Sequence, residues 1–160
     1  MNEAIIILLG YTIALCIKGG GVPSSLSASV FNLPYDKRWI WTVVLYGVVI
    51  LAMPTYMDKV SQNTQFLAFL AMAGLAFVGA APLVKDHQEL AYKVHCWAAV
   101  VCAVCSQLVL VFNQPWLLLC WVPFVAYEVW RLSKKQPWRT QTFWGEMVCF
   151  VSTFTFCLIP

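Results

Sequence analysis

Charged side chains are scarce in this sequence. Its 160 residues include 10 Lys or Arg and 7 Asp or Glu, so 11% of the chain is charged, whereas soluble domains carry about 25%. This scarcity, together with a hydrophobic content of 61%, excludes an ordinary soluble domain. The net charge of +3 is divided among separate polar segments, which excludes a nucleic-acid-binding surface. The composition predicts a protein that lives in a lipid bilayer.

Long polar stretches are also missing, and apolar runs fill most of the chain. A helix that crosses a hydrocarbon core needs about 20 residues, and these runs lack the alternation of membrane strands. We therefore predict an all-α bundle of six transmembrane helices that forms a single domain over residues 1–160. The predicted spans are 4–17, 39–57, 66–84, 94–112, 116–131 and 143–159.

Lysine and arginine are distributed unequally between the two sides of such a bundle. Nine of them follow the first, third and fifth spans, and only Lys59 lies on the other side. The positive-inside rule then predicts a multi-pass protein of the inner membrane with both termini outside the cytoplasm. Because Glu3 precedes the first apolar run and Lys18 follows it, we expect this run to remain as a helix rather than to be a cleaved signal peptide.

The segment between the first two spans is unusually polar for this chain. Its serines and its bounding prolines predict a short amphipathic helix over 24–33 with Ser24 as N-cap, too short to cross the bilayer. We expect it to lie at the interface or to form a re-entrant element. Its N-terminus, near Lys18, is a candidate binding position for an anionic lipid headgroup.

Small residues mark two spans for close packing. Ala73, Ala76 and Ala80 recur along the third span, with Gly79 beside them. The fourth span offers either Ala98, Cys102 and Cys105, or Ala99, Ala103 and Ser106. Because transmembrane helices associate through close contact, we expect these two spans to form the centre of the bundle. The seven cysteines all lie in apolar runs, where they are expected to pack as small hydrophobic side chains.

Ionisable and hydroxyl groups gather toward the basic side. Ionisable groups inside spans are costly, which makes them functional candidates. Ser25, Ser29, His95, Glu128 and Glu146 are predicted to line one vestibule open to the cytoplasm. A structural alternative pairs Glu128 with Arg131 and turns Glu146 toward the basic loop 131–139.

Three functions are compatible with this pattern. The first is binding or passage of a small amphiphile, lipid or ion through the vestibule, without catalysis and without a cofactor. The second is a scaffold or accessory subunit that binds a partner membrane protein, and a homodimer is compatible with either function. The third is an intramembrane metal-dependent hydrolase of lipid or amide bonds.

The hydrolase hypothesis comes from a resemblance. Ser25 or Ser27, the pair Asp86 and His87, and His95 resemble the serine, aspartate and histidine set of the alkaline ceramidase and adiponectin-receptor superfamily. The resemblance implies a zinc ion that activates water. This chain has six predicted spans, two histidines and no histidine pair in its last span. A zinc site made of Asp86, His87 and His95, or one that includes Glu128, would therefore need a carboxylate ligand.

Overall fold

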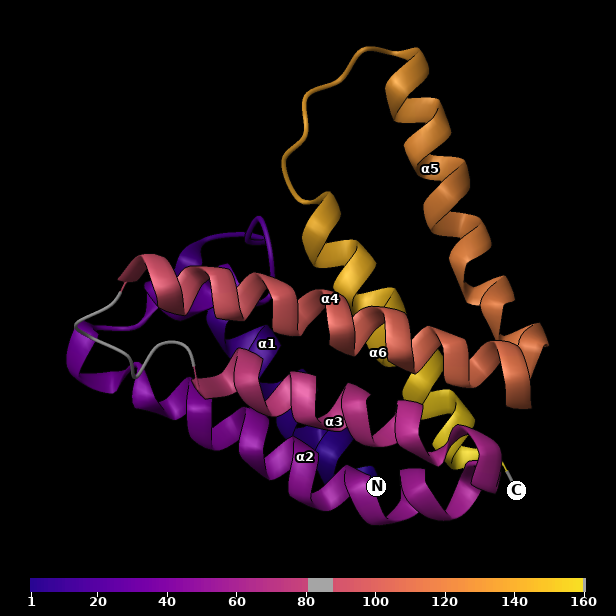
Figure 1. Ribbon diagram of the computed structural model, residues 1–160. Helices are drawn as coiled ribbons and strands as arrows, with labels where there is room; N and C mark the ends of the chain where they lie inside the picture. Colours follow the sequence, from indigo (N-terminus) through magenta and orange to yellow (C-terminus); the bar gives the residue numbers. More distant parts are fainter. Residues whose placement is uncertain (81–87, 160) are drawn as a thin grey trace.

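The computed structural model describes residues 1–80 and 88–159 (Figure 1). All regular elements in this described part are helices, and four segments are long and apolar enough to cross a membrane: Asn2–Gly19, Tyr35–Lys59, Gln62–Ala80 and Tyr92–Asn113. The predicted all-α class is confirmed, and the four long apolar helices indicate a membrane protein, whereas the predicted fifth and sixth spans are not among these four. The helices are α1 (Asn2–Gly19), η1 (Ser27–Asn32), η2 (Tyr35–Lys37), α2 (Trp39–Lys59), η3 (Gln62–Thr64), α3 (Gln65–Ala80), α4 (Gln88–Asn113), η5 (Pro115–Trp121), α5 (Val122–Ser133) and α6 (Gln141–Leu158).

Each predicted span coincides with a helix or with a pair of consecutive helices. The fifth span is divided into the 3-10 helix η5 and the α-helix α5, with Pro123 in the first turn of α5, where a missing N–H costs nothing. Residues 81–84 of the third predicted span lie outside the described residues. The positions of the helices therefore follow from local sequence, because apolar length is a local property.

One end of the bundle is held by the side chain of Asn113. Its Oδ1 accepts a hydrogen bond from the backbone N–H of Ser61 at 3.0 Å, and its Nδ2 donates to Thr64 Oγ1 at 3.0 Å. The end of α4 is thereby joined to the turn between α2 and α3. Lys59 donates to the carbonyl of Ile159, which places the end of α6 at the same end of the bundle.

Helices α3 and α4 pack closely, as predicted, but through a different residue of α3. The closest approach is at Gly74, where an added Cβ would lie 2.8 Å from the Ala98 carbonyl oxygen and 3.0 Å from the Cys102 nitrogen. Of the two faces predicted for α4, the one with Ala98 and Cys102 makes this contact. Ala73 and Ala76 are only half-buried, whereas Gly79 faces Leu45 of α2. The prediction that the alanine face of α3 contacts α4 is therefore wrong, because α3 is rotated so that Gly74 makes the closest approach. All seven cysteines are free thiols.

The serine segment is shorter and tighter than predicted. It forms the six-residue 3-10 helix η1 rather than a ten-residue helix over 24–33. Ser24 is not its cap: the hydroxyl of Ser25 instead accepts the backbone N–H of Ala28 at 3.0 Å. Leu26 and Val30 are buried, as the amphipathic spacing predicts. Asn32 donates to the carbonyl of Leu15 at 3.3 Å, which folds the segment back onto the end of α1.

Helix α5 diverges from the rest of the bundle. The polar residues Asn113 and Gln114 and the following Pro115 predict a tight turn and an antiparallel hairpin of the fourth and fifth spans, but Figure 1 shows α5 leading away from α4. Only η5 stays beside α4, where Gln107 Oε1 accepts from Trp121 Nε1 at 2.8 Å and from Ser152 Oγ at 3.3 Å. These bonds confirm that Gln107 finds partners across a helix interface, as its position in an apolar run predicts.

Candidate functional site

A cavity of about 410 Å³ lies among α2, α3, α4 and α6, and its wall also includes the start of η1, Trp121 of η5 and Phe124 of α5. Most side chains on its wall are apolar or thiol groups, such as Leu45, Leu75, Cys102 and Phe150. Cavities of a few hundred Å³ with apolar walls and few polar groups are typical of small-molecule sites. The lining residues that are also exposed, Val100, Trp138 and Thr142, mark its open side, among α4, the loop that joins α5 to α6 and the start of α6.

Glu146 brings the main polar group to this cavity. Its Oε2 accepts a hydrogen bond from the backbone N–H of Leu26 at 2.5 Å. A second bond, from the N–H of Phe143 to the carbonyl of Ser24 at 3.1 Å, holds the same two segments together. Within the described part of the chain, no Lys or Arg lies within 4.0 Å of the Glu146 carboxylate. The expected pairing with the basic loop 131–139 is therefore replaced by a backbone donor.

The hydroxyls of the serine segment are arranged around Leu26. Ser29 is buried and donates to the Leu26 carbonyl, while Ser25 and Ser27 are 3.1 Å apart between their hydroxyl oxygens. Among the serines of this segment, Ser27 lines the cavity. Ser25 and Ser29 therefore shape the segment that Glu146 holds. The Leu26 amide, near the position where an anionic headgroup was predicted, is already bonded to a carboxylate of the chain itself.

His95 lies on α4 and is not among the residues of the cavity wall. Among the contacts between α2 and α3, the Val78 carbonyl accepts a hydrogen bond from Trp41 Nε1 at 3.4 Å. Thr42 Oγ1 donates to the next carbonyl, that of Gly79, at 2.7 Å. These two bonds join α2 to the last described turn of α3. His95 is therefore separate from the group of residues around Glu146 that line the cavity.

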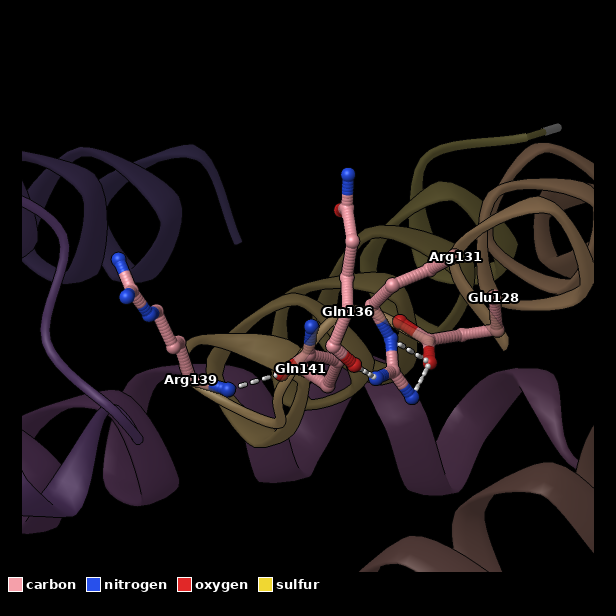
Figure 2. Close-up of polar contacts among 5 residues, drawn as sticks. All are labelled: Glu128, Arg131, Gln136, Arg139 and Gln141. Atoms are coloured by element: carbon pink, nitrogen blue, oxygen red, sulfur yellow. Dashed lines mark hydrogen bonds and ion pairs between the residues drawn. The ribbon is translucent and has the colours of Figure 1, made fainter. Parts of the chain in front are cut away.

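Glu128 is engaged in the ion pair predicted from its spacing. Its Oε2 accepts from Arg131 at 2.7 and 2.8 Å, and Arg131 also donates to the Gln136 carbonyl at 2.6 Å (Figure 2). The guanidinium lies 5.4 Å from the ring centre of Trp138, which lines the cavity. The pair therefore positions one wall of the cavity without lining it.

The loop after this pair continues into the cavity wall through Gln141. Figure 2 shows Gln141 beside Arg139, whose backbone N–H donates to Gln141 Oε1 at 2.5 Å. Gln141 is 3% exposed and lines the cavity. This bond fixes the amide at the start of α6.

Of the five predicted site residues, the structure brings Ser25, Ser29 and Glu146 together and leaves His95 and Glu128 in separate contacts. The predicted vestibule also differs in character, because its wall is mainly apolar. Sequence reasoning missed Gln141 and Thr153. For Thr153 the available signal was its spacing of seven positions from Glu146 along α6, since residues three, four and seven positions apart share one helical face. Gln141, five positions before Glu146, does not fit this spacing.

The metal hypothesis is tested only for part of the chain. Among residues 1–80 and 88–159, no three His, Cys, Asp or Glu side chains are grouped so as to hold a metal ion. Asp86 and His87 lie outside the described residues, so the set with His95 stays a prediction.

Comparison with known proteins does not assign the chain to a class: no protein-family model, no curated protein and no solved structure matches it. The functional argument therefore rests on the residues themselves.

Proposed function

We propose that this chain is a six-span protein of the inner membrane that binds a single-chain amphiphile in the cavity beside Glu146. The four long apolar helices support the membrane location. Six crossings are supported by connectivity: α4 ends beside Ser61, whereas α6 begins beside Ser24, at the other end of α2. Helix α2 has 21 residues and so is about 31 Å long. Because α4 ends at one end of α2 and α6 begins at the other, residues 114–140 must cover a comparable distance, which is the fifth crossing of the bilayer.

The orientation follows from charge. The basic residues after α1 and α5 lie at the cavity end, and the unequal distribution of lysine and arginine favours a cytoplasmic location for that end. Both termini would then be extracytoplasmic. The short η1 segment serves as a partly buried connector on the cytoplasmic side, joined to α6 by the hydrogen bond from the Leu26 N–H to Glu146.

The single observation that carries the binding function is an apolar cavity with a carboxylate at its wall. Hydrocarbon fits the wall, and the exposed lining residues Val100 and Trp138 give the cavity an open side. An amphiphile that enters there can bury its chain against apolar side chains. A large hydrophilic solute would have to lose its hydration against apolar side chains, which is costly.

The carboxylate also indicates the headgroup. An ionised carboxylate only accepts hydrogen bonds, and within the described residues the Oε1 atom of Glu146 has no partner. The complementary headgroup is a donor, such as a primary ammonium or a hydroxyl group. An anionic headgroup would be repelled, because no basic side chain in the described residues offsets Glu146.

Binding of dodecylamine to the purified protein, counted by native mass spectrometry after release from micelles, tests this function. Ala103→Phe fills the cavity and should abolish retention of the amine. Val104→Phe adds a similar side chain at the next residue, which is 51% exposed and does not line the cavity, and should retain it. Dodecanoate, with the same chain length and an anionic head, should bind more weakly than dodecylamine.

The outcomes separate the alternatives. Equal retention by both phenylalanine variants would contradict the cavity as the binding place. Tighter binding of dodecanoate would contradict the headgroup assignment alone. Retention of neither amphiphile by the unmodified protein would overturn the proposal and favour the scaffold function.

A further inference from the structure

Thr153 gives the cavity a second polar feature, at a distance from Glu146. The residue is 6% exposed and lines the cavity, and its Oγ1 has no hydrogen-bond partner among the described residues. A buried hydroxyl without a partner costs free energy, and in native structures such groups are rare. Its neighbour Ser152, by contrast, donates to the Cys149 carbonyl and to Gln107. The free hydroxyl therefore points to a group that the chain itself does not supply.

The position of Thr153 relative to Glu146 defines a length. The two residues are seven positions apart on α6, which corresponds to about 10 Å along the helix axis. Between them the wall is formed by Cys149 and Phe150 of α6 and by Cys102 of α4, none of which is a strong hydrogen-bonding group. A polar headgroup at Glu146 is therefore followed by an apolar stretch and then by the unpartnered hydroxyl of Thr153, whereas the hydroxyl of Ser106 on the wall already donates to the Ala103 carbonyl.

We propose that the ligand is a linear amphiphile with a donor headgroup at Glu146 and an oxygen about 10 Å farther along its chain, which pairs with Thr153 Oγ1. This inference rests on the proposed function and adds the substrate class to it. A hydroxyl both donates and accepts, so the distal oxygen belongs to a hydroxyl, a carbonyl or an ether. A plain saturated amine would leave Thr153 unpartnered and would bind less tightly.

The test compares dodecylamine with a dodecylamine that carries a hydroxyl in the distal part of its chain. Both are titrated against the purified protein in nanodiscs, with binding followed by native mass spectrometry. The hydroxylated amine should bind about three- to tenfold more tightly, the range expected of one net hydrogen bond. Thr153→Val keeps the side-chain shape but removes the hydroxyl, and it should abolish this preference while plain dodecylamine still binds.

Thr155→Val is the matched control, because Thr155 lies on α6 but not on the cavity wall, and it should leave the preference unchanged. Equal affinity of the two amines for the unmodified protein would overturn the distal-oxygen assignment and leave the proposed function standing. A preference that persists in Thr153→Val would overturn it as well. Failure of both amines to bind would overturn the proposed function itself.

Discussion

The carboxylate of Glu146 accepts a hydrogen bond from the backbone N–H of Leu26, 120 residues earlier in the chain. The bond joins the connector after α1 to the first turns of α6. It also fixes a charged group on the wall of an otherwise apolar cavity. One side chain thus combines a structural contact with the polar feature on which the proposed binding function depends.

These two roles of Glu146 are separable by substitution. Glu146→Gln keeps an oxygen acceptor for Leu26 N–H, so the protein should fold, but it should bind dodecylamine at least about tenfold more weakly because the charge is lost. Glu146→Leu leaves the Leu26 N–H unpartnered and should lower the unfolding free energy by about 1–3 kcal/mol. Thermal unfolding in detergent and amine binding measure the two effects. Unchanged amine affinity in Glu146→Gln would show that the carboxylate is only structural.

Gly74 is expected to be intolerant of any larger side chain. Gly74→Ala places a Cβ 2.8 Å from the Ala98 carbonyl oxygen, so α3 and α4 must move apart. We expect a loss of about 1–3 kcal/mol of stability, as for other overpacked sites, seen as a lower melting temperature in detergent. Gly47→Ala is the control, because an added Cβ there meets no atom within 4 Å. Equal melting temperatures for the two variants would contradict the close packing of α3 and α4 at Gly74.

The ion pair of Glu128 and Arg131 is buried, with side-chain exposures of 15% and 5%. Glu128→Leu leaves the guanidinium without its carboxylate and should destabilise the protein by about 3–5 kcal/mol. Replacing both residues, with Glu128→Leu and Arg131→Met, should recover much of this loss, since no buried charge is then left unpaired. Unfolding in detergent provides the measurement. A double variant less stable than Glu128→Leu would instead indicate that the bond from Arg131 to Gln136 dominates.

The proposed orientation in the membrane predicts which residues are accessible from outside the cell. A cysteine at Ser61 should react with a membrane-impermeant maleimide in intact cells, because the turn between α2 and α3 is placed outside. A cysteine at Lys135, in the loop between α5 and α6, should react only after permeabilisation. The protein without an added cysteine gives the background from its seven native thiols. Labelling of Lys135→Cys in intact cells would overturn the proposed orientation.

Zinc content tests the hydrolase hypothesis. Glu128 is paired with Arg131, so one of the residues considered as zinc ligands already has another partner. We expect metal analysis of the purified protein to show less than one zinc per chain. Stoichiometric zinc that is lost in a His87→Ala variant would contradict the amphiphile-binding proposal and favour the hydrolase.

Contacts within one helix or its next turn were the easiest to predict. The pair of Glu128 and Arg131 follows from a spacing of three residues, and the burial of Leu26 and Val30 follows from one of four. The partner of Glu146 was missed because every residue except proline has a backbone N–H, so the sequence does not indicate which one binds a given carboxylate. Gly74 was missed because a span rich in small residues offers several faces, and only the rotation of the helix selects one.

The sequence by itself determined the membrane class and the positions of the helices, because run length and hydropathy are properties of neighbouring residues. The unequal distribution of lysine and arginine between the connecting segments can likewise be seen in the sequence alone. Only the tertiary structure decided that Glu146 and Thr153 line one cavity, and that His95 and Glu128 do not. In lipid, helices of similar apolarity have no hydrophobic preference for one rotation over another, so a few close contacts and interhelical hydrogen bonds decide which face each helix turns inward.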